Sequence, residues 1–206
     1  MNNDRKGLMI VLSSPSGAGK TSLCKKILSS DRNIILSVSS TTRPKRKSEV
    51  NGKDYSFFSE KEFIKQKKRN LFIETAKVFD FYYGTPKEFV EKNLAKGRDI
   101  LFDIDWQGTQ KLSDYSRNDL VSIFILPPST DELKKRLKKR AEDSDAIVEK
   151  RMSKARSEIS HWIEYDYVLI NNNIDECLEK ILVIIQAERL KRFRQNYIFD
   201  FVEKLT

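Results

Sequence analysis

Cysteine and histidine are scarce in this chain. Its 206 residues include two cysteines, Cys24 and Cys177, and a single histidine, His161. The two cysteines lie far apart, and neither has a second cysteine at CxxC spacing. A zinc site and a disulfide framework are therefore excluded as the organising features, and a reducing compartment fits the composition. We expect a cytoplasmic protein in which Cys24 is a small core residue.

Long apolar runs are also missing. The first run, residues 8–12, is too short for a secretory signal, and no later run reaches the length that spans a bilayer. Internal repeats and low-complexity linkers are absent as well. Hydrophobic residues at 39% and charged residues at 33% are typical of a globular protein, and 206 residues suffice for one domain.

Positive charge, by contrast, is in excess. The formal net charge is +9 and the sequence pI is about 9.4. Such a balance favours anionic partners, which include nucleic acid, an acidic membrane surface and small phosphorylated ligands. Charge alone does not choose among these three.

One short stretch, residues 10–21 (IVLSSPSGAGKT), indicates a chemistry. An apolar strand-like run ends in small residues, which are followed by Gly-Lys-Thr and the opening of a helix. This order is typical of a P-loop, whose backbone amides, helix N-terminus and lysine together bind phosphates. Ser14 stands where the strict pattern has its first glycine. We predict that a triphosphate is bound by Ser14, Pro15, Ser16, Gly17, Ala18, Gly19, Lys20 and Thr21.

Apolar runs alternate with helical patterns along most of the chain. Because each strand-like run is apolar throughout, we expect an α/β fold with a parallel sheet covered by helices on both faces. The predicted strands are residues 8–12, 33–38, 100–104, 120–126 and 167–170. The predicted helices are one that opens with residues 22–28, then 60–68, 87–96, 107–115, one from Thr130, one from 145 to about 162, and 176–194.

Two segments interrupt this alternation. Residues 39–85 are rich in aromatic residues and turns, which predicts an inserted β-rich lobe, and residues 131–162 are strongly basic and helical. Ligands of parallel sheets bind at the carboxyl ends of the strands. The phosphate loop, residues 39–46 and residues 103–105 all follow or end strands, so we expect them to meet in one cleft.

Several motifs together resemble one known family. The segments SSPSGAGKT, SVSSTTRPKR, EVNGKDYSFF, FIETAKVFDFYYGT and ILFDIDWQG occur in the order found in guanylate kinases, over almost the whole chain. The resemblance implies the reaction ATP + GMP → ADP + GDP with Mg²⁺. It also implies a core (1–38, 86–130 and 163–206), a GMP-binding lobe (about 39–85) and a lid (about 131–162).

The resemblance implies how guanine is recognised. Guanine offers two donors, N1–H and N2–H₂, and a single carboxylate can accept from both. Glu74 matches the family position with this role, and Ser39, Thr85 and Asp105 match other contacts to the base. Thr85 replaces the usual serine and keeps the hydroxyl.

The same resemblance assigns the residues around the phosphates. Arg43, Arg46, Tyr55 and Tyr83 match the GMP-phosphate contacts; without the motif, the two tyrosines would be interpreted as core aromatics. An arginine fork suits phosphate better than the point charge of a lysine. Arg136, Arg140 and Arg151 match the arginines of the lid, which with Lys20 neutralise charge during transfer.

Metal and adenine contacts complete the implied site. Thr21 would bind Mg²⁺ through its hydroxyl, and Asp103 would bind the ion through water. Asn171 resembles a residue near the adenine, although the next position, Asn172, is usually acidic. The expected ligands are ATP and GMP, with dGMP as a further acceptor and without nucleic acid or membrane partners.

Three alternatives remain open on sequence alone. A non-catalytic guanylate-kinase-like module would bind protein partners, but such modules generally lack an intact phosphate loop. A nucleoside-monophosphate kinase of other base specificity is a further alternative, but Glu74 together with Ser39 favours GMP over AMP or CMP. A nucleic-acid-binding protein would explain the net charge, but no recognition motif of that class is present. The apolar C-terminal segment, residues 193–205, fits either packing on the core or a subunit contact.

Overall fold

The computed structural model describes residues 5–47, 49–78, 80–141 and 145–206, and its central feature is a five-stranded sheet. All four pairings are parallel, and the strand order is β2-β7-β1-β8-β9. The predicted parallel α/β sheet is thus confirmed. Its strands are β1 (Met9–Ser13), β2 (Ile34–Leu36), β7 (Asp99–Asp103), β8 (Leu120–Leu126) and β9 (Tyr167–Ile170).

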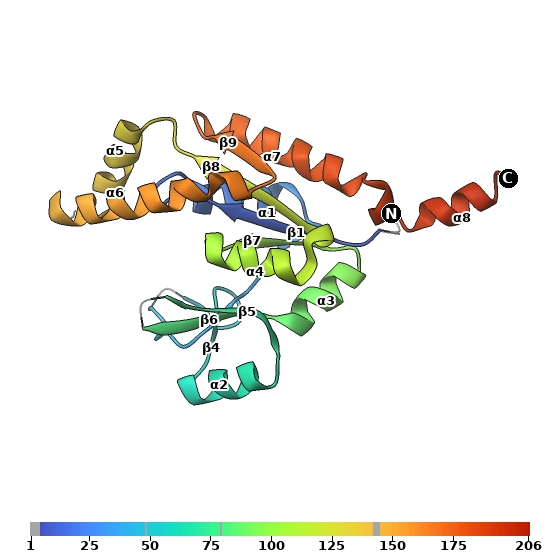
Figure 1. Cartoon of the computed structure of the whole chain (residues 1–206), viewed down its shortest axis with the longest axis horizontal. Coiled ribbons are helices and arrows are strands. Elements are labelled where there is room, and N and C mark those ends of the chain that lie inside the picture. The colour runs from blue at the N-terminus through green and yellow to red at the C-terminus, as the bar shows by residue number, and fades with distance from the viewer. Residues whose placement is uncertain (1–4, 48, 79, 142–144) are drawn as a thin grey trace.

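Helices cover both faces of this sheet (Figure 1). Strand β1 is buried along its whole length, and its side chains alternate between two apolar layers. Ile10 and Leu12 pack in the layer of α1 (Lys20–Ser30) and α7 (Ile174–Arg189). Met9 and Val11 pack in the layer of α3 (Lys87–Ala95) and α4 (Trp106–Ser116). An apolar strand with no polar face requires cover on both sides.

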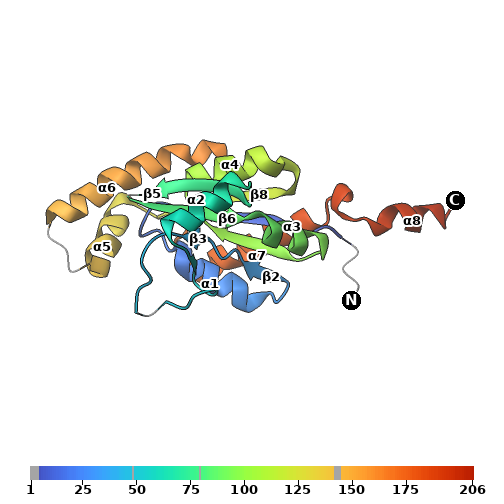
Figure 2. The same cartoon turned by 90° about the horizontal axis from the view of Figure 1, so that it is seen from below.

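A second, smaller sheet lies beside α4, in the order β4-β3-β6-β5 (Figures 1 and 2). Helix α2 (Glu60–Lys68) covers it, and Phe63 of that helix stacks on Phe72 with ring centroids 4.6 Å apart. The strands of this lobe are β3 (Ser40–Thr41), β4 (Ser56–Phe57), β5 (Phe72–Val78) and β6 (Phe81–Pro86). The lobe occupies the segment where the sequence predicted a β-rich insertion with one short helix.

Helices α5 (Thr130–Ala141) and α6 (Asp145–Ile159) pair at one end of the molecule (Figures 1 and 2). They bury a small apolar cluster of their own, which includes Leu133, Leu137 and Met152. The hydroxyl of Ser129, rather than that of Thr130, accepts a hydrogen bond from the Glu132 amide and caps α5. Residues 142–144 and the side chain of Arg140, a predicted lid arginine, lie outside the described part.

The C-terminal helices differ from the sequence expectation. Helix α7 starts at Ile174, where the Asn173 side chain caps it, and ends at Arg189 instead of continuing to residue 194. The chain turns after this helix, and the Arg194 carbonyl accepts a hydrogen bond from the Lys6 amide at 3.1 Å. Helix α8 (Tyr197–Glu203) then projects away from the sheet and buries none of its residues, so it does not pack on the core (Figure 1).

Short 3₁₀ helices complete the chain: η1 (Arg117–Asp119), η2 (Ser160–Glu164) and η3 (Arg192–Arg194). The helix predicted to run to about residue 162 therefore changes from α to 3₁₀ at Ser160. Among the described residues, no helix combines the length and apolarity that a membrane crossing requires.

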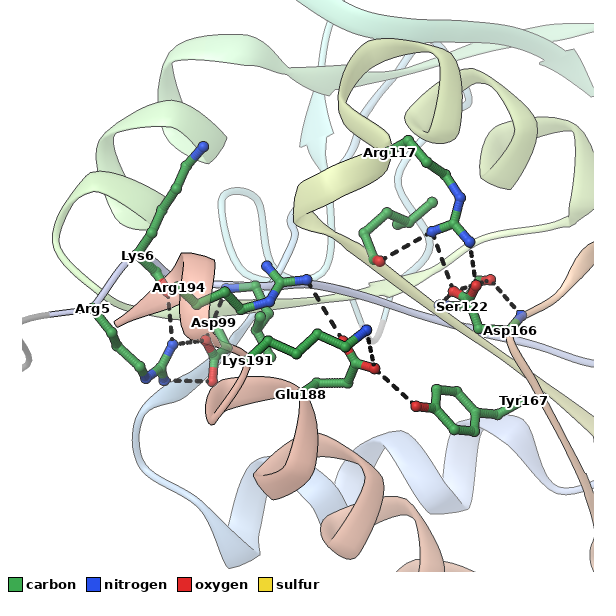
Figure 3. Close-up of polar contacts among 12 residues, drawn as sticks. Arg5, Lys6, Asp99, Arg117, Ser122, Asp166, Tyr167, Glu188, Lys191 and Arg194 are labelled. Atoms are coloured by element: carbon green, nitrogen blue, oxygen red, sulfur yellow. Dashed lines mark hydrogen bonds and ion pairs between the residues drawn. The ribbon is translucent and has the colours of Figure 1, made fainter. Parts of the chain in front are cut away.

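A buried carboxylate fixes the amino end of the sheet. Asp99, at the start of β7, is fully buried and accepts two hydrogen bonds from the Arg5 guanidinium at 2.8 and 2.9 Å (Figure 3). It also accepts from the Leu8 amide at 2.9 Å and from Nε of Arg189 at 2.7 Å. One side chain thus joins the N-terminal segment, the central sheet and α7, at the end opposite the loop after β1.

Candidate functional site

The loop between β1 and α1 has the backbone that its glycines predict. Gly17 and Gly19 have φ angles of +94° and +103°, which ordinary residues adopt at a cost. Gly19 is the N-cap of α1, so Lys20 is the first helical residue. The free amides at a helix N-terminus bind anions, and here they adjoin a lysine.

This loop forms one wall of a cavity of about 540 Å³. The opposite wall comes from the carboxyl end of β7 and from the two helices α5 and α6. The lining residues are Ser13, Ser14, Pro15, Ser16, Gly17, Gly19, Lys20, Thr21, Ser22, Asp103, Asp105, Trp106, Phe124, Arg136 and Glu158. All of the predicted phosphate-loop residues except the buried Ala18 line this cavity.

Lys20 and Asp103 form an ion pair within the cavity. The Lys20 ammonium lies 2.5 Å from Oδ1 of Asp103 and donates to the carbonyl of Ile104 at 3.3 Å. Because β1 and β7 are neighbouring parallel strands, the loop after one meets the end of the other. The phosphate loop and residues 103–105 therefore meet at one cavity, as expected.

Of the three predicted lid arginines, Arg136 lines the cavity. Its Nε donates to the Glu132 carboxylate, one turn earlier in α5, at 2.8 Å. Arg151 lies in α6 and is not among the lining residues, and the side chain of Arg140 is outside the described part.

The side chain of Asn171 contacts the backbone of the loop between β1 and α1. Its side chain is buried after β9 and donates to the Ala18 carbonyl at 2.8 Å. A Cβ atom on Gly19 would come within 2.5 Å of the same amide nitrogen. The structure thus places Asn171 against the loop backbone, and it is not among the residues that line the cavity.

A second cavity of about 240 Å³ adjoins the first. The two share Lys20, Asp103 and Asp105, and the second extends into the small lobe. Its lining residues are Lys20, Ser39, Tyr55, Glu74, Ala76, Tyr83, Asp103, Ile104, Asp105 and Gly108. Tyr55 and Tyr83 therefore face a cavity, with their ring centroids 6.1 Å apart, and are not enclosed core aromatics.

Glu74 is the buried acid of this second cavity. Burial raises the pKa of Glu74 above its ordinary value, whereas a hydrogen bond from Thr85 lowers it. That bond joins Oγ1 of Thr85 to Oε1 of Glu74 at 2.9 Å, and Thr85 itself is fully buried behind the carboxylate. Asp105 also lines the cavity, and its carboxylate caps α4 by accepting from the Gly108 amide at 3.0 Å.

Glu49 binds Arg43 and Arg46 in the basic segment beside Tyr55 and Tyr83. Its carboxylate accepts from the Arg43 guanidinium at 2.6 Å and from the Arg46 amide at 2.8 Å. The hydrogen bond to Glu49 is the main reason that the pKa of Arg43 is raised. The Arg43 guanidinium also lies over the Tyr55 ring, 5.4 Å from its centroid, whereas Arg46 is exposed to solvent. Neither arginine is among the residues that line the second cavity.

Among the residues that sequence reasoning missed are Trp106 and Glu158, which line the larger cavity, and Glu49, which pairs with Arg43. Trp106 could have been found, because it directly follows Asp105 at the end of a predicted strand. Its ring stacks on His161 with the centroids 3.6 Å apart. No local signal marks Glu158, since its place in the cavity depends on how α6 lies against the loop.

Comparisons with known proteins agree with this geometry. The family model described as guanylate kinase matches residues 6–188. The chain belongs to the guanylate kinase family. The guanylate kinase of Nitrobacter winogradskyi is 52% identical over 202 residues, which cover 98% of this chain and 92% of that protein. The guanylate kinase of Rhizobium etli is 49% identical over 201 residues, which cover 98% and 91%.

A solved guanylate kinase shares the architecture. The crystal structure of the Anaplasma phagocytophilum guanylate kinase is 40% identical to this chain and has a TM-score of 0.79. The alignment covers 97% of this chain and 95% of that one. A guanylate kinase is a nucleotide-binding transferase, so the two adjoining cavities belong to an enzyme.

Proposed function

We propose that this guanylate kinase transfers the γ-phosphoryl group of ATP to GMP, with ATP in the larger cavity and GMP in the smaller one. The observation that carries this proposal is the junction between the cavities. Lys20, Asp103 and Asp105 line both of them, so groups bound on either side meet at one lysine. A binding module without catalysis has no need for such a junction.

Glu74 is proposed to select guanine. Its carboxylate accepts from N1–H and N2–H₂ of the base, and the buried Thr85 hydroxyl holds it in place. Ser39 and Asp105 supply further polar contacts in the same cavity. A site built to accept two hydrogen bonds rejects bases that cannot donate both, because its carboxylate is then left unpaired.

The GMP phosphate is assigned to the basic and phenolic side chains of the lobe. Tyr55 and Tyr83 line the cavity, and Arg43 lies against the Tyr55 ring. Arg46 is tied to Arg43 through their shared partner Glu49. Lobe movement is proposed to bring both guanidinium groups onto the phosphate, for which their forked donors are suited.

The ATP phosphates are assigned to the loop of residues 14–21. Lys20 neutralises the transferred group, and Arg136, Arg140 and Arg151 are proposed to close over it from the lid. Asn171 acts in this scheme as a positioning residue, because it holds the Ala18 carbonyl. The proposed organisation is therefore the core (1–38, 86–130 and 163–206), the GMP lobe (39–85) and the lid (131–162).

The donor set fits a magnesium ion carried by ATP. Thr21 and Asp103 line the same cavity and offer hard oxygen atoms, which Mg²⁺ prefers. Within the described residues, no group of three or more His, Cys, Asp or Glu side chains could hold a metal ion without substrate. The ion would be bound by Thr21, by Asp103 through water, and by phosphate oxygens, and it would neutralise charge on those oxygens.

Transfer needs alignment more than proton removal. The attacking atom is a phosphate oxygen, whose second pKa of about 6 leaves it largely ionised at neutral pH. No strong general base is therefore required. Lys20 and the lid arginines supply charge neutralisation, and closure of the lid excludes water that would otherwise accept the phosphoryl group.

Substrate preference is tested by measuring ADP release in a coupled assay. ATP–Mg²⁺ is supplied with GMP, dGMP, AMP, CMP or UMP in separate reactions. Turnover is expected with GMP and dGMP. The proposal fails if GMP supports no turnover or if AMP supports as much. The scarcity of cysteine supports the cytoplasm as the place of this reaction.

The role of Lys20 is tested with a matched pair of lysine variants in α1. Lys20→Ala should lose at least about 100-fold in kcat, since it removes a charge aimed at the transferred group. Lys26→Ala removes a partly exposed lysine from the same helix, where it pairs with Asp175, and should keep full activity. Equal activity of the two variants would remove Lys20 from the mechanism.

A further inference from the structure

A lid carboxylate contacts the phosphate loop directly. Oε2 of Glu158, in α6, accepts a hydrogen bond from the Ser16 amide at 3.1 Å. Glu158 lines the larger cavity, and 19% of its side-chain surface is exposed. The two residues come from elements far apart in the sequence, so this contact depends on how the lid lies over the loop.

Glu158 binds a different donor from the other acids in or beside this cavity, of which Asp105 accepts from the Gly108 amide of α4. Asp103 pairs with the Lys20 ammonium, and Glu132 pairs with the Arg136 guanidinium next to the cavity. Those carboxylates hold cationic side chains of the site. Glu158 instead takes a backbone donor of the loop itself, and its Oε1 lies 3.9 Å from the ammonium of Lys154 on the same helix.

A carboxylate at this position resembles a phosphate in its chemistry. Both present anionic oxygen atoms, and both accept hydrogen bonds from backbone amides at a loop that precedes a helix. The same amide cannot serve both groups well. Two anions side by side in one cavity also repel each other more strongly than they would in open solvent.

We propose that Glu158 competes with nucleotide phosphates for the loop and thereby sets the affinity of the enzyme for ATP and ADP. Binding of a nucleotide then exchanges the Glu158 contact for a phosphate contact and frees this part of the lid. The inference rests on the proposed function, because it assumes that residues 14–21 bind the ATP phosphates. It makes Glu158 a residue that weakens binding and favours product release.

The test is a set of calorimetric titrations without acceptor. Wild type and Glu158→Gln are each titrated with ATP–Mg²⁺, ADP–Mg²⁺ and adenosine. The glutamine keeps the shape but removes the charge, so Kd for ATP and ADP should fall by about fivefold or more. Kd for adenosine should not change, because adenosine carries no phosphate.

Two further variants make the result decisive. Glu149→Gln removes the same charge from α6 at an exposed side chain outside the cavity, and its nucleotide affinities should match wild type. Glu158→Ala should shift affinity in the same direction as Glu158→Gln. Thermal unfolding of each variant verifies that the lid remains folded.

The possible failures are distinguishable. Unchanged or weaker ATP binding by Glu158→Gln, together with loss of ATP binding in Lys20→Ala, overturns this inference alone. Retention of ATP binding in Lys20→Ala overturns the loop assignment on which the proposed function rests. Equal tightening by Glu149→Gln and Glu158→Gln would show a general effect of lid charge, and it also overturns the inference.

Discussion

At the scale of single residues, Glu74 carries the most specific expectation about pH. Burial raises the pKa of Glu74, and only the ionised carboxylate can accept from both guanine donors. As the pH falls through this raised pKa, Glu74 protonates and GMP binding weakens. KM for GMP is therefore expected to rise on acidification at a higher pH than an ordinary glutamate would cause. KM for ATP, measured over the same range, should not follow that rise.

Thr85 provides the check on this assignment. Its hydrogen bond to Glu74 favours the ionised form, so Thr85→Val should shift the acid rise in KM for GMP to still higher pH. Near neutral pH, KM should also increase by about tenfold, as expected for losing a hydrogen bond to a charged group. Thr85→Ser keeps the hydroxyl and should behave as wild type. Identical pH profiles for the valine and serine variants would contradict the role of this bond.

At the scale of elements, the phosphate loop depends on its contact with the end of β9. Gly19 and Gly52 both have positive φ, but only Gly19 lies against another side chain, that of Asn171. Alanine at either position costs about 1–2 kcal/mol in backbone energy. Gly19→Ala must in addition displace Asn171, so we expect it to raise the Kd for ATP at least about tenfold.

Gly52→Ala is the matched control for this prediction. A Cβ at position 52 meets no atom within 4 Å, and Gly52 is outside both cavities. It should lose stability without losing ATP affinity, as followed by denaturant unfolding and calorimetry. Similar ATP affinities in the two variants would indicate that the Asn171 contact is unimportant for the loop.

The same elements show what sequence could and could not predict. Strand β1, the loop and α1 are readable because local patterns determine them: an apolar run, two glycines and a lysine in fixed order. The lid helices start at residues 130 and 145, as predicted. The end of α6 and both ends of α7 were misplaced, because the change to a 3₁₀ helix at Ser160, capping by Asn173 and the turn after Arg189 depend on neighbours. The place of Asn171 near the adenine stays a prediction, whereas its hydrogen bond to the Ala18 carbonyl depends on tertiary packing and was not predicted. Glu158 was missed because only the lid-to-loop arrangement brings it to Ser16.

At the scale of the whole molecule, we expect binding and stability to depend on opposite ends of the central sheet. The cavities lie at the carboxyl ends of β1 and β7, whereas Asp99 sits at the amino end of β7 (Figure 3). The buried residues of the two main apolar layers come from neither the lobe nor the lid, although Ile73 of β5 packs against the layer of α3 and α4, and the lid helices have a small cluster of their own. We therefore expect that the lobe and the lid can change position with little disturbance of the packing that holds the sheet together.

The substitution Asp99→Asn tests whether the stability of the sheet is separate from nucleotide binding. Asp99→Asn leaves the Arg5 guanidinium facing a neutral amide, whereas Arg189 keeps its ion pair with Asp31 at 2.7 Å. Breaking a buried pair by removing one partner costs about 3–5 kcal/mol, because here the charge of Arg5 stays buried without compensation. We expect the free energy of unfolding, measured with denaturant, to fall by that amount. Below the unfolding transition, the KM values for ATP and GMP should remain those of the wild type.

Asp175→Asn makes the same chemical change at the surface. Asp175 pairs with Lys26, and both side chains are largely solvated, so the loss should be at most about 0.5 kcal/mol. An Asp99→Asn variant as stable as Asp175→Asn would contradict the role of Asp99 as the anchor of the sheet. If Asp99→Asn were folded but bound nucleotides weakly, the two ends of β7 would be coupled. The cavities would then require an intact amino end of the sheet, and the separation argued for this molecule would not hold.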